Sequence, residues 1–411
     1  MSTPATALSF GEVLRNSAVK RLWIAQIVSV FGDFLALFAV IAYVTFKLQG
    51  TPVQISMIMV SFMTPLALFS PVAGVFVDKW NLKATMIASD LIRGCLILSL
   101  IFVHDLHAIY GIFFALASVS AFFFPAQSVA VRTIAPANGL MAVNALMSQA
   151  FQGSQIIAPA IAGTLVQLTG ANACFIFDTA SFFFSAAMVF TIPLHREPHP
   201  STAASTVLQS MGAGLRFMFS HSAIAFVIVS STIGMFAVRC FGALVSVYVR
   251  DVLALNPAGY GILNTLIGVG MIIGTQLITR FGRHIPKQNL VVYGLGIMGL
   301  AVMLIALLGV VVATATGMLV MGFGAAFVMI SSQTLVQQET PKEMLGRVMS
   351  AYMSLSATSQ AVAMFFAGPF AERMGIKTLY IASAVMLLVV AAIGHTKLKG
   401  LSSATAAATE G

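Results

Sequence analysis

Residues 22–46 read LWIAQIVSVFGDFLALFAVIAYVTF, and Asp33 is the one charged residue among them. A helix crosses the hydrocarbon core of a bilayer with about 20 mostly apolar residues. The stretch therefore predicts a transmembrane helix near the start of the chain. Met1 to Arg21 contains no short apolar core followed by a small-residue cleavage site, so we expect this helix to be retained in the membrane.

The same kind of apolar stretch recurs along the chain, and with the first one we count twelve. The others are Val53–Val77, Ala84–Val103, Ala108–Val131, Leu140–Leu168, Asn172–Pro193, Ala223–Val249, Ala258–Thr279, Gln288–Val310, Ala313–Gln333, Arg347–Phe370 and Thr378–Ile393. The pattern predicts an all-α membrane protein with two six-helix bundles. We expect an N-terminal bundle over 1–194, a polar linker over 195–222, and a C-terminal bundle with a short tail over 223–411. Within the linker, apolar residues at helical spacing fit either a helix on the membrane surface or an ordinary frayed connection: Val207, Met211, Leu215, Met218 and Phe219.

The composition of the whole chain agrees with this prediction. Hydrophobic residues make up 59% of it and charged residues 8%, and the mean hydropathy is +0.98. Soluble domains carry about 25% charged residues. This excludes an ordinary soluble enzyme and a disordered chain. The net charge of +9 does not indicate a nucleic-acid partner, because the basic residues are spread over short loops and not gathered on one face.

The basic residues also predict the orientation, because loops rich in Lys and Arg stay in the cytoplasm. One side of the predicted membrane would hold only Lys47, Arg250, Arg373 and Lys377. The other would hold Arg15, Lys20, Arg21, Lys79, Lys83, Arg132, Arg196, Arg216, Arg280, Arg283, Lys287, Lys342, Arg347, Lys397 and Lys399. We therefore expect a multi-pass protein of the plasma (inner) membrane with both termini and the long central linker in the cytoplasm.

Two pairs of loops suggest an internal repeat. A segment that begins with Gly74 at the end of one predicted span has a counterpart 200 residues later at Gly274, and a loop that begins with Pro136 has one 205 residues later at Pro341. Parallel repeats of this kind build transporters with a central cavity between their halves.

No pattern for an enzyme, a cofactor or a metal ion is found in the sequence. The three cysteines lie far apart, the histidines lie at predicted loops or helix ends, and P-loop, HExxH and GxSxG patterns are absent. We therefore expect no enzymatic activity, no cofactor and no metal site. Without an ATP site, transport would be driven by an ion or substrate gradient.

Several motifs resemble the major facilitator superfamily over nearly the whole chain. The loop Gly74-x-x-x-Asp78-Lys79-x-x-x-Lys83 resembles its signature between spans two and three, with Asn81 and Leu82 in place of Gly-Arg. The chain most resembles the drug-exporter branch with the macrolide-efflux and enterobactin-exporter proteins, through Phe31-Gly32-Asp33, Phe124-Pro125-Ala126 and 339–348. Residues 24–33 and Arg239 also resemble the lysophospholipid transporter family. The antiporter signature of span five is half present, as Ala158-Pro159-Ala-Ile-Ala162-Gly163.

Asp33 is the first candidate for the transport mechanism. Gln26 and Ser29 share its helix face, because they precede it by seven and four residues. Burial favours the neutral form of a carboxyl group and a nearby arginine favours its charged form. A carboxyl balanced between the two can bind and release a proton; a structural hydrogen bond or a fixed ion pair is the alternative.

Arg239 is the second candidate. The resembling fold places spans one and seven face to face, so Arg239 would either pair with Asp33 or bind an anionic group of the substrate; snorkelling to an interface is the alternative. In span five, Gln152 and Gln155 continue a polar stripe with Ser148. This stripe would either line a cavity or join helices through hydrogen bonds.

The remaining charged residues suggest a gating network. Asp90 and Arg93 lie three residues apart on span three and can pair along one helix face. The resemblance implies that the loop signature stabilises one transport state. We assign the network to Gly74, Asp78, Lys79, Lys83, Asp90, Arg93 and Arg347. Asp178 in span six would cap or pair structurally, because this span is peripheral in the resembling fold, or else line the pathway.

Together, these features predict a secondary active transporter. Its expected partners are a small amphipathic substrate that it exports, protons that drive it, and membrane lipid, with no nucleic acid; we expect a monomer. A lysophospholipid transporter of the same fold is the alternative.

Overall fold

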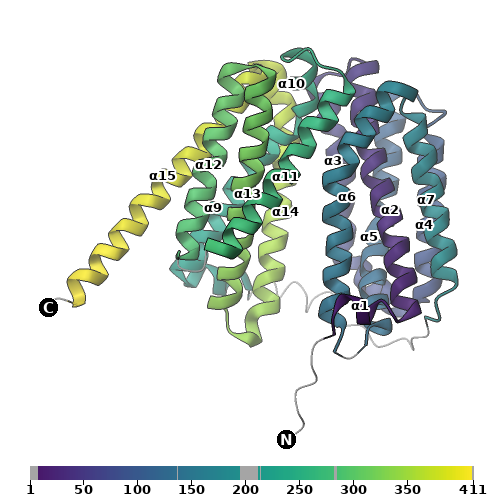
Figure 1. Ribbon diagram of the computed structural model, residues 1–411, viewed down its shortest axis with the longest axis horizontal. Coiled ribbons are helices and arrows are strands. Elements are labelled where there is room, and N and C mark those ends of the chain that lie inside the picture. Colours follow the sequence, from purple (N-terminus) through teal and green to yellow (C-terminus); the bar gives the residue numbers. More distant parts are fainter. Residues whose placement is uncertain (1–7, 137, 195–211, 213, 282–284, 410–411) are drawn as a thin grey trace, which may run out of the picture. The chain divides into compact units, whose positions relative to one another are not determined.

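The computed structural model describes residues 8–136, 138–194, 212, 214–281 and 285–409. Every regular element within these ranges is a helix (Figure 1). The helices are α1 (Phe10–Val13), α2 (Ser17–Ala42), the π-helix η1 (Tyr43–Lys47), α3 (Pro52–Lys79), α4 (Leu82–Ser99), α5 (Leu106–Ile134), α6 (Leu140–Thr169), α7 (Asn172–Phe190), α9 (Ser222–Ala243), α10 (Val245–Asp251), α11 (Pro257–Phe281), α12 (Lys287–Leu308), α13 (Val311–Glu339), α14 (Lys342–Met374) and α15 (Ile376–Thr409).

Each predicted span corresponds to a long helix. Among the described residues, nine helices are long and apolar enough to cross a membrane. The helices α4, α6 and α14 form at the predicted places but are more polar. The reason is visible in their sequences: α4 carries Asp90 and Arg93, α6 carries the glutamine stripe, and α14 carries serines and a charged first turn.

Side-chain caps explain where several helices begin. Asn16 Oδ1 accepts from the backbone N–H of Ala18 at the start of α2, and Asn81 Oδ1 accepts from that of Ala84 at the start of α4. At the start of α5, the Ala108 N–H donates to Asp105 Oδ2 (3.0 Å), and this bond holds the pKa of that carboxyl below its usual value.

Two predicted spans differ from a single regular helix. The span predicted over Ala223–Val249 is interrupted at Leu244 (φ −121°, ψ 15°), which separates α9 from α10. The span predicted over Ala84–Val103 is shorter, because α4 ends at Ser99 and the next residues make i to i−3 hydrogen bonds, from Ile101 to Leu98 and from Phe102 to Ser99. Such tight turns are common at helix ends.

The described part of the linker is also helical. Residues 214–220 form helical turns, in which Met218 is buried and Phe219 is exposed. The predicted positions Val207 and Met211 lie outside the described residues.

The chain divides into two compact units. Unit 1 comprises Met1–Gln49, Ile58–Ala204 and Asn256–Ile262, and unit 2 comprises Gly50–Met57, Ser205–Leu255 and Leu263–Gly411. Unit 1 thus includes the start of α11 from the second half of the sequence, and unit 2 includes the start of α3 from the first half.

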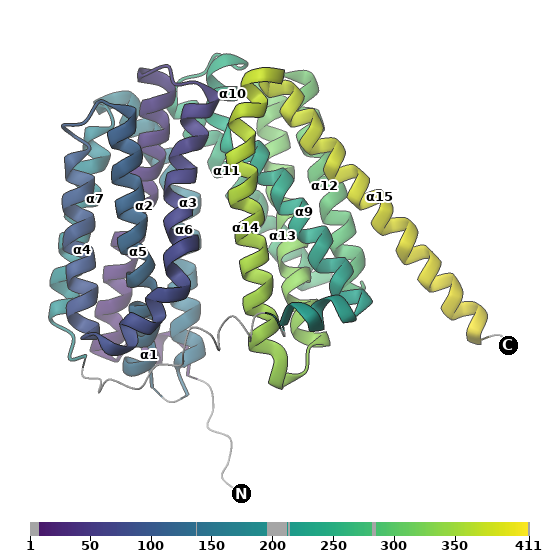
Figure 2. The same cartoon turned by 180° about the vertical axis from the view of Figure 1, so that it is seen from behind.

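The same helix pairs pack in both halves of the chain. In the first half, α2 packs on α6 and α7, and α4 packs on α5 and α7; Figures 1 and 2 show α2, α4 and α7 side by side. In the second half, α9 packs on α14 and α15, and α12 packs on α13 and α15. These are the corresponding helices in chain order, so the packing supports the internal repeat inferred from the loops.

Candidate functional site

A cluster of charged side chains lies within unit 1, where α2, α4 and α7 pack together. It consists of Asp33 on α2, Asp90 and Arg93 on α4, and Asp178 on α7. Asp90, Arg93 and Asp178 are almost completely buried. We call these four residues the acidic cluster.

Asp90 and Arg93 form the closed part of the acidic cluster. An Arg93 Nη atom donates to Asp90 Oδ1, as the three-residue spacing predicts, and Ser185 Oγ donates to Asp90 Oδ2 (2.7 Å). The guanidinium also lies over the rings of Phe123 and Phe182, at 4.2 and 4.4 Å from their centroids. Aromatic faces attract a cation, so Arg93 is held on several sides.

Asp33 is the accessible part of the acidic cluster. Its Oδ2 lies 3.9 Å from Arg93 Nη1, which is a loose ion pair, and its side chain is 34% exposed. The other two residues of the predicted polar face, Gln26 and Ser29, are buried, and Gln26 Oε1 accepts from Gln127 Nε2 of α5 (2.5 Å). The polar face thus joins α2 to α5 through the glutamines and ends at a carboxyl group that water reaches.

Asp178 packs directly against the backbone of α2. A Cβ atom on Gly32 would lie 2.4 Å from Asp178 Oδ1, so only glycine fits between the two helices here. Ser181 Oγ is within hydrogen-bond distance of both the Asp178 backbone carbonyl oxygen (2.8 Å) and Asp178 Oδ1 (3.1 Å). Asp178 is therefore a neighbour of Asp33, which the sequence alone did not reveal.

Arg239 lies in unit 2, near the end of α9, and its partner there is Gln360 of α14. Arg239 Nε donates to Gln360 Oε1 (2.6 Å), and the arginine is exposed in the described structure. The guanidinium has several donors in a fixed fork, so an anionic group could bind to those directed away from Gln360.

The polar stripe of α6 lies on an exposed helix face. Gln152 and Gln155 are exposed, and Gln152 Nε2 donates to Ser148 Oγ on the same helix (3.0 Å). Amide groups facing lipid would lack hydrogen-bond partners, so this face favours contact with water or with a ligand over contact with lipid.

The predicted gating residues outside the acidic cluster have varied surroundings. Gly74, Asp78 and Lys79 lie on α3, and their side chains are outside what the structure describes. Lys83 lies over the ring of Phe190 (5.0 Å), and Arg347 Nη1 approaches Met344 Sδ (3.9 Å). These contacts do not connect Lys83 or Arg347 to Asp90 and Arg93.

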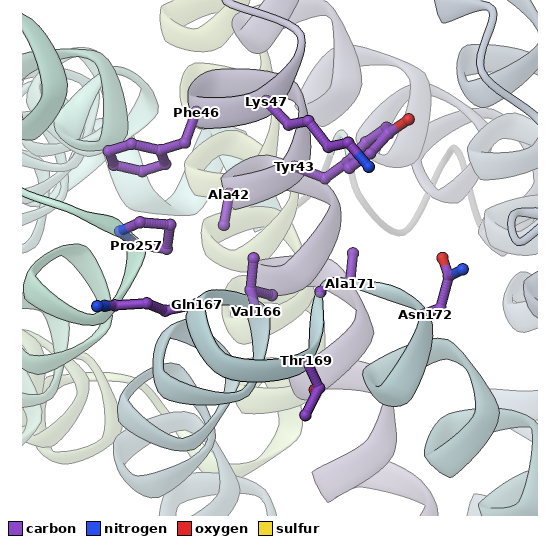
Figure 3. A pocket seen from close by; sticks show the side chains of 11 residues that line it. Ala42, Tyr43, Phe46, Lys47, Val166, Gln167, Thr169, Ala171, Asn172 and Pro257 are labelled. Carbon is purple, nitrogen blue, oxygen red and sulfur yellow. The ribbon is translucent and has the colours of Figure 1, made fainter.

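A cavity of about 440 Å³ lies in unit 1 beside η1 (Figure 3). Lys47 lies next to Tyr43, with its Nζ 5.5 Å from the ring centroid, whereas Phe46 extends from the opposite side of the helix. The rest of the lining comes from the ends of α2 and α6, the two-residue connection to α7, the first residue of α7 and Pro257. The sequence analysis did not identify this cavity. Single π-helical turns are frequent at functional sites. The amino-acid composition of Tyr43–Lys47 does not predict a π-helix.

Comparisons with known proteins agree with the fold. Residues 22–362 match the family model of the Major Facilitator Superfamily. YfiS, an MFS-type transporter of Bacillus subtilis, is 26% identical, and the alignment covers 90% of each chain. Macrolide efflux protein A of Streptococcus pyogenes is 24% identical over 90% of this chain and 94% of its own. A crystal structure of the nucleoside transporter NupG superposes with a TM-score of 0.76 at 14% identity, and covers 92% of this chain and 99% of its own.

The family match extends over most of the chain, and the helices are arranged as the resemblance implied. The matching family consists of transporters, and an efflux protein is among the relatives. The chain belongs to the Major Facilitator Superfamily and is a multi-pass integral membrane transporter.

Proposed function

We propose that this transporter exports amphipathic small molecules of drug- or siderophore-like chemistry by alternating access, in exchange for protons. The observation that carries the proposal is Asp33, a partly exposed carboxyl in the middle of α2 whose Oδ2 makes only a loose contact with Arg93 (3.9 Å). A carboxyl in these surroundings can change its protonation without a large loss of packing. The similarity to macrolide efflux protein A supports export as the direction.

Other features complete the proposed mechanism. Gln152 and Gln155 would hydrogen-bond the substrate, and the many methionine and phenylalanine side chains would give an adaptable apolar wall. The two six-helix bundles would rock about a central site. We place the protein in the plasma (inner) membrane as a monomer, with both termini in the cytoplasm.

Transport in proteoliposomes tests the coupling. With a pH gradient imposed, we expect purified wild-type protein to accumulate a radiolabelled macrolide. Asp33→Asn should still bind the macrolide but lose the accumulation driven by the gradient, because the amide cannot exchange a proton. Asp105→Asn is the matched control, since asparagine caps a helix as well as aspartate does and Asp105 lies outside the acidic cluster. Normal accumulation by Asp33→Asn with an unchanged pH profile would refute the proposal.

Arg239 supports a second candidate, a lysophospholipid transporter. Its exposed guanidinium could bind the phosphate of a lipid headgroup as well as the anionic group of a drug. Transfer of a labelled lysophospholipid between leaflets without any pH gradient, with loss of transfer in Arg239→Gln, would favour this candidate. Macrolide accumulation that depends on the gradient, with no lipid transfer, would exclude it.

A further inference from the structure

The acidic cluster brings together more negative than positive charge. Three carboxyl groups lie around the single guanidinium of Arg93, all within the junction of α2, α4 and α7. Asp90 has the closest contact with Arg93, and Asp33 has a loose one. The third carboxyl, Asp178, has no cation bonded to it among the described residues.

The fold itself does not require these charges. In the corresponding junction of the second half, where α9, α12 and α15 pack, leucine side chains lie against the glycine. There, Gly234 of α9 faces Leu295 of α12 and Leu387 of α15, and both leucines are completely buried. A glycine thus allows close helix packing in both junctions: Gly234 packs against leucine side chains in the second half, and Gly32 packs against Asp178 in the first. The carboxyl groups of the first junction therefore call for an explanation beyond packing.

Asp178 is buried in a way that disfavours its charged form. The residue is 0% exposed, its Oδ1 accepts from Ser181, and its Oδ2 has no hydrogen-bond partner in the described structure. An ionised carboxyl with an unsatisfied oxygen and no bonded cation is strongly unfavourable in a protein interior. A proton on Oδ2 removes the charge and leaves Oδ1 free to accept from Ser181.

Other titratable groups on the surrounding helices do not change this balance. Cys174 lies one turn before Asp178 and is neutral as a thiol, and α6 has no titratable side chain. The remaining charged residues of α2, α4 and α5 lie toward the helix ends: Lys20, Arg21, Lys83 and Arg132. Arg21 is 12 residues from Asp33, about 18 Å along the helix, and donates to the Thr191 carbonyl.

We propose that Asp178 is a second proton-binding carboxyl, that it carries a proton in the described conformation, and that this proton exchanges with water through Asp33. Asp33 is the one partly exposed carboxyl of the acidic cluster, and it follows Gly32, the residue against which Asp178 packs. Proton exchange would thus use two carboxyl groups in series, with Arg93 and Asp90 as a fixed pair beside them. The proposal rests on the proposed proton coupling for its role in transport, but not for the protonation itself.

Infrared spectroscopy of the full-length protein in lipid nanodiscs tests the protonation. At neutral pH we expect a C=O stretching band of a protonated carboxylic acid that shifts in D₂O. The band should vanish in Asp178→Asn and persist in Asp33→Asn. If Asp178→Asn does not fold, Ser181→Ala provides the test: loss of the hydrogen bond to Oδ1 should move the band to higher frequency. A band that is absent from the wild type, or that neither variant changes, would overturn the proposal.

The rate of the D₂O shift tests the route of the proton. Exchange should slow in Asp33→Leu, whereas Asp105→Asn, at the start of α5 and outside the acidic cluster, should leave the rate unchanged. Equal rates in Asp33→Leu and wild type would refute exchange through Asp33. Neither measurement needs a substrate or a gradient, so failure of proton-driven export would not alter their outcome.

Discussion

At the scale of single residues, only part of the acidic cluster could be predicted from the sequence. Charged residues in apolar stretches identified Asp33, Asp90, Arg93 and Asp178 as candidates, and helical spacing predicted the pairing of Asp90 with Arg93. The approach of Asp33 to Arg93 could not be predicted, because it depends on how α2 rotates against α4. The contact between Asp178 and Gly32 depends in the same way on the packing of α7 against α2.

The first prediction concerns the buried pair. Arg93→Gln should lower the free energy of unfolding by about 3–5 kcal/mol, because Asp90 would keep a buried charge without its partner. The double variant Arg93→Gln/Asp90→Asn should recover much of this loss, since it leaves no charge of the pair behind. Thermal unfolding in detergent measures both. A double variant as unstable as Arg93→Gln would show that the loss comes from the aromatic contacts of Arg93 and not from Asp90.

At the scale of helices, hydropathy located most of the elements within a few residues. It missed their irregularities and the continuation of α15 to Thr409, well beyond the predicted end at Ile393. Neither the break at Leu244, which follows Gly242 by two residues, nor the π-helix at Tyr43–Lys47 contains a proline. In α10, Tyr248 donates its hydroxyl to the Ile305 carbonyl (2.7 Å) and its ring packs beside Tyr380. Both partners are distant in sequence, so the direction of the helix after Leu244 is decided by tertiary contacts.

The second prediction concerns the close approach of α6 and the start of α11 within unit 1. A Cβ atom on Gly163 would lie 2.3 Å from the Pro257 carbonyl oxygen, and one on Gly261 would lie 2.1 Å from that of Pro159. Gly163→Val should therefore separate these backbones and reduce transport in proteoliposomes. Gly153→Val on the same helix is the control, because its Cβ would meet nothing within 4 Å. Equal transport by the two variants would show that the described contact is not used in the transport cycle.

At the scale of the whole molecule, the repeat was readable from paired loops, and the corresponding helix pairs support it. The chemical difference between the two halves could be predicted only in part from the sequence. The sequence shows that α4 is charged and that its counterpart α12 is apolar in its middle, but not that both form the same junction with a neighbouring glycine. Family membership explains the shared packing, and the charged side chains of the first half are the ones to which we assign the proposed proton coupling.

The last prediction concerns the orientation of the chain in the membrane. Gln49 precedes α3 and Trp80 follows it, and the helix has 28 residues, about 42 Å, which exceeds the roughly 30 Å hydrocarbon core. The two positions must therefore lie on opposite sides of the bilayer. Because the basic residues are concentrated on the side of Trp80, that side should be cytoplasmic. In a variant without native cysteines, Gln49→Cys should react with a membrane-impermeant maleimide in intact cells, and Trp80→Cys only after permeabilisation. The reverse pattern would invert the topology and, with it, the direction in which the proposed proton gradient drives the substrate.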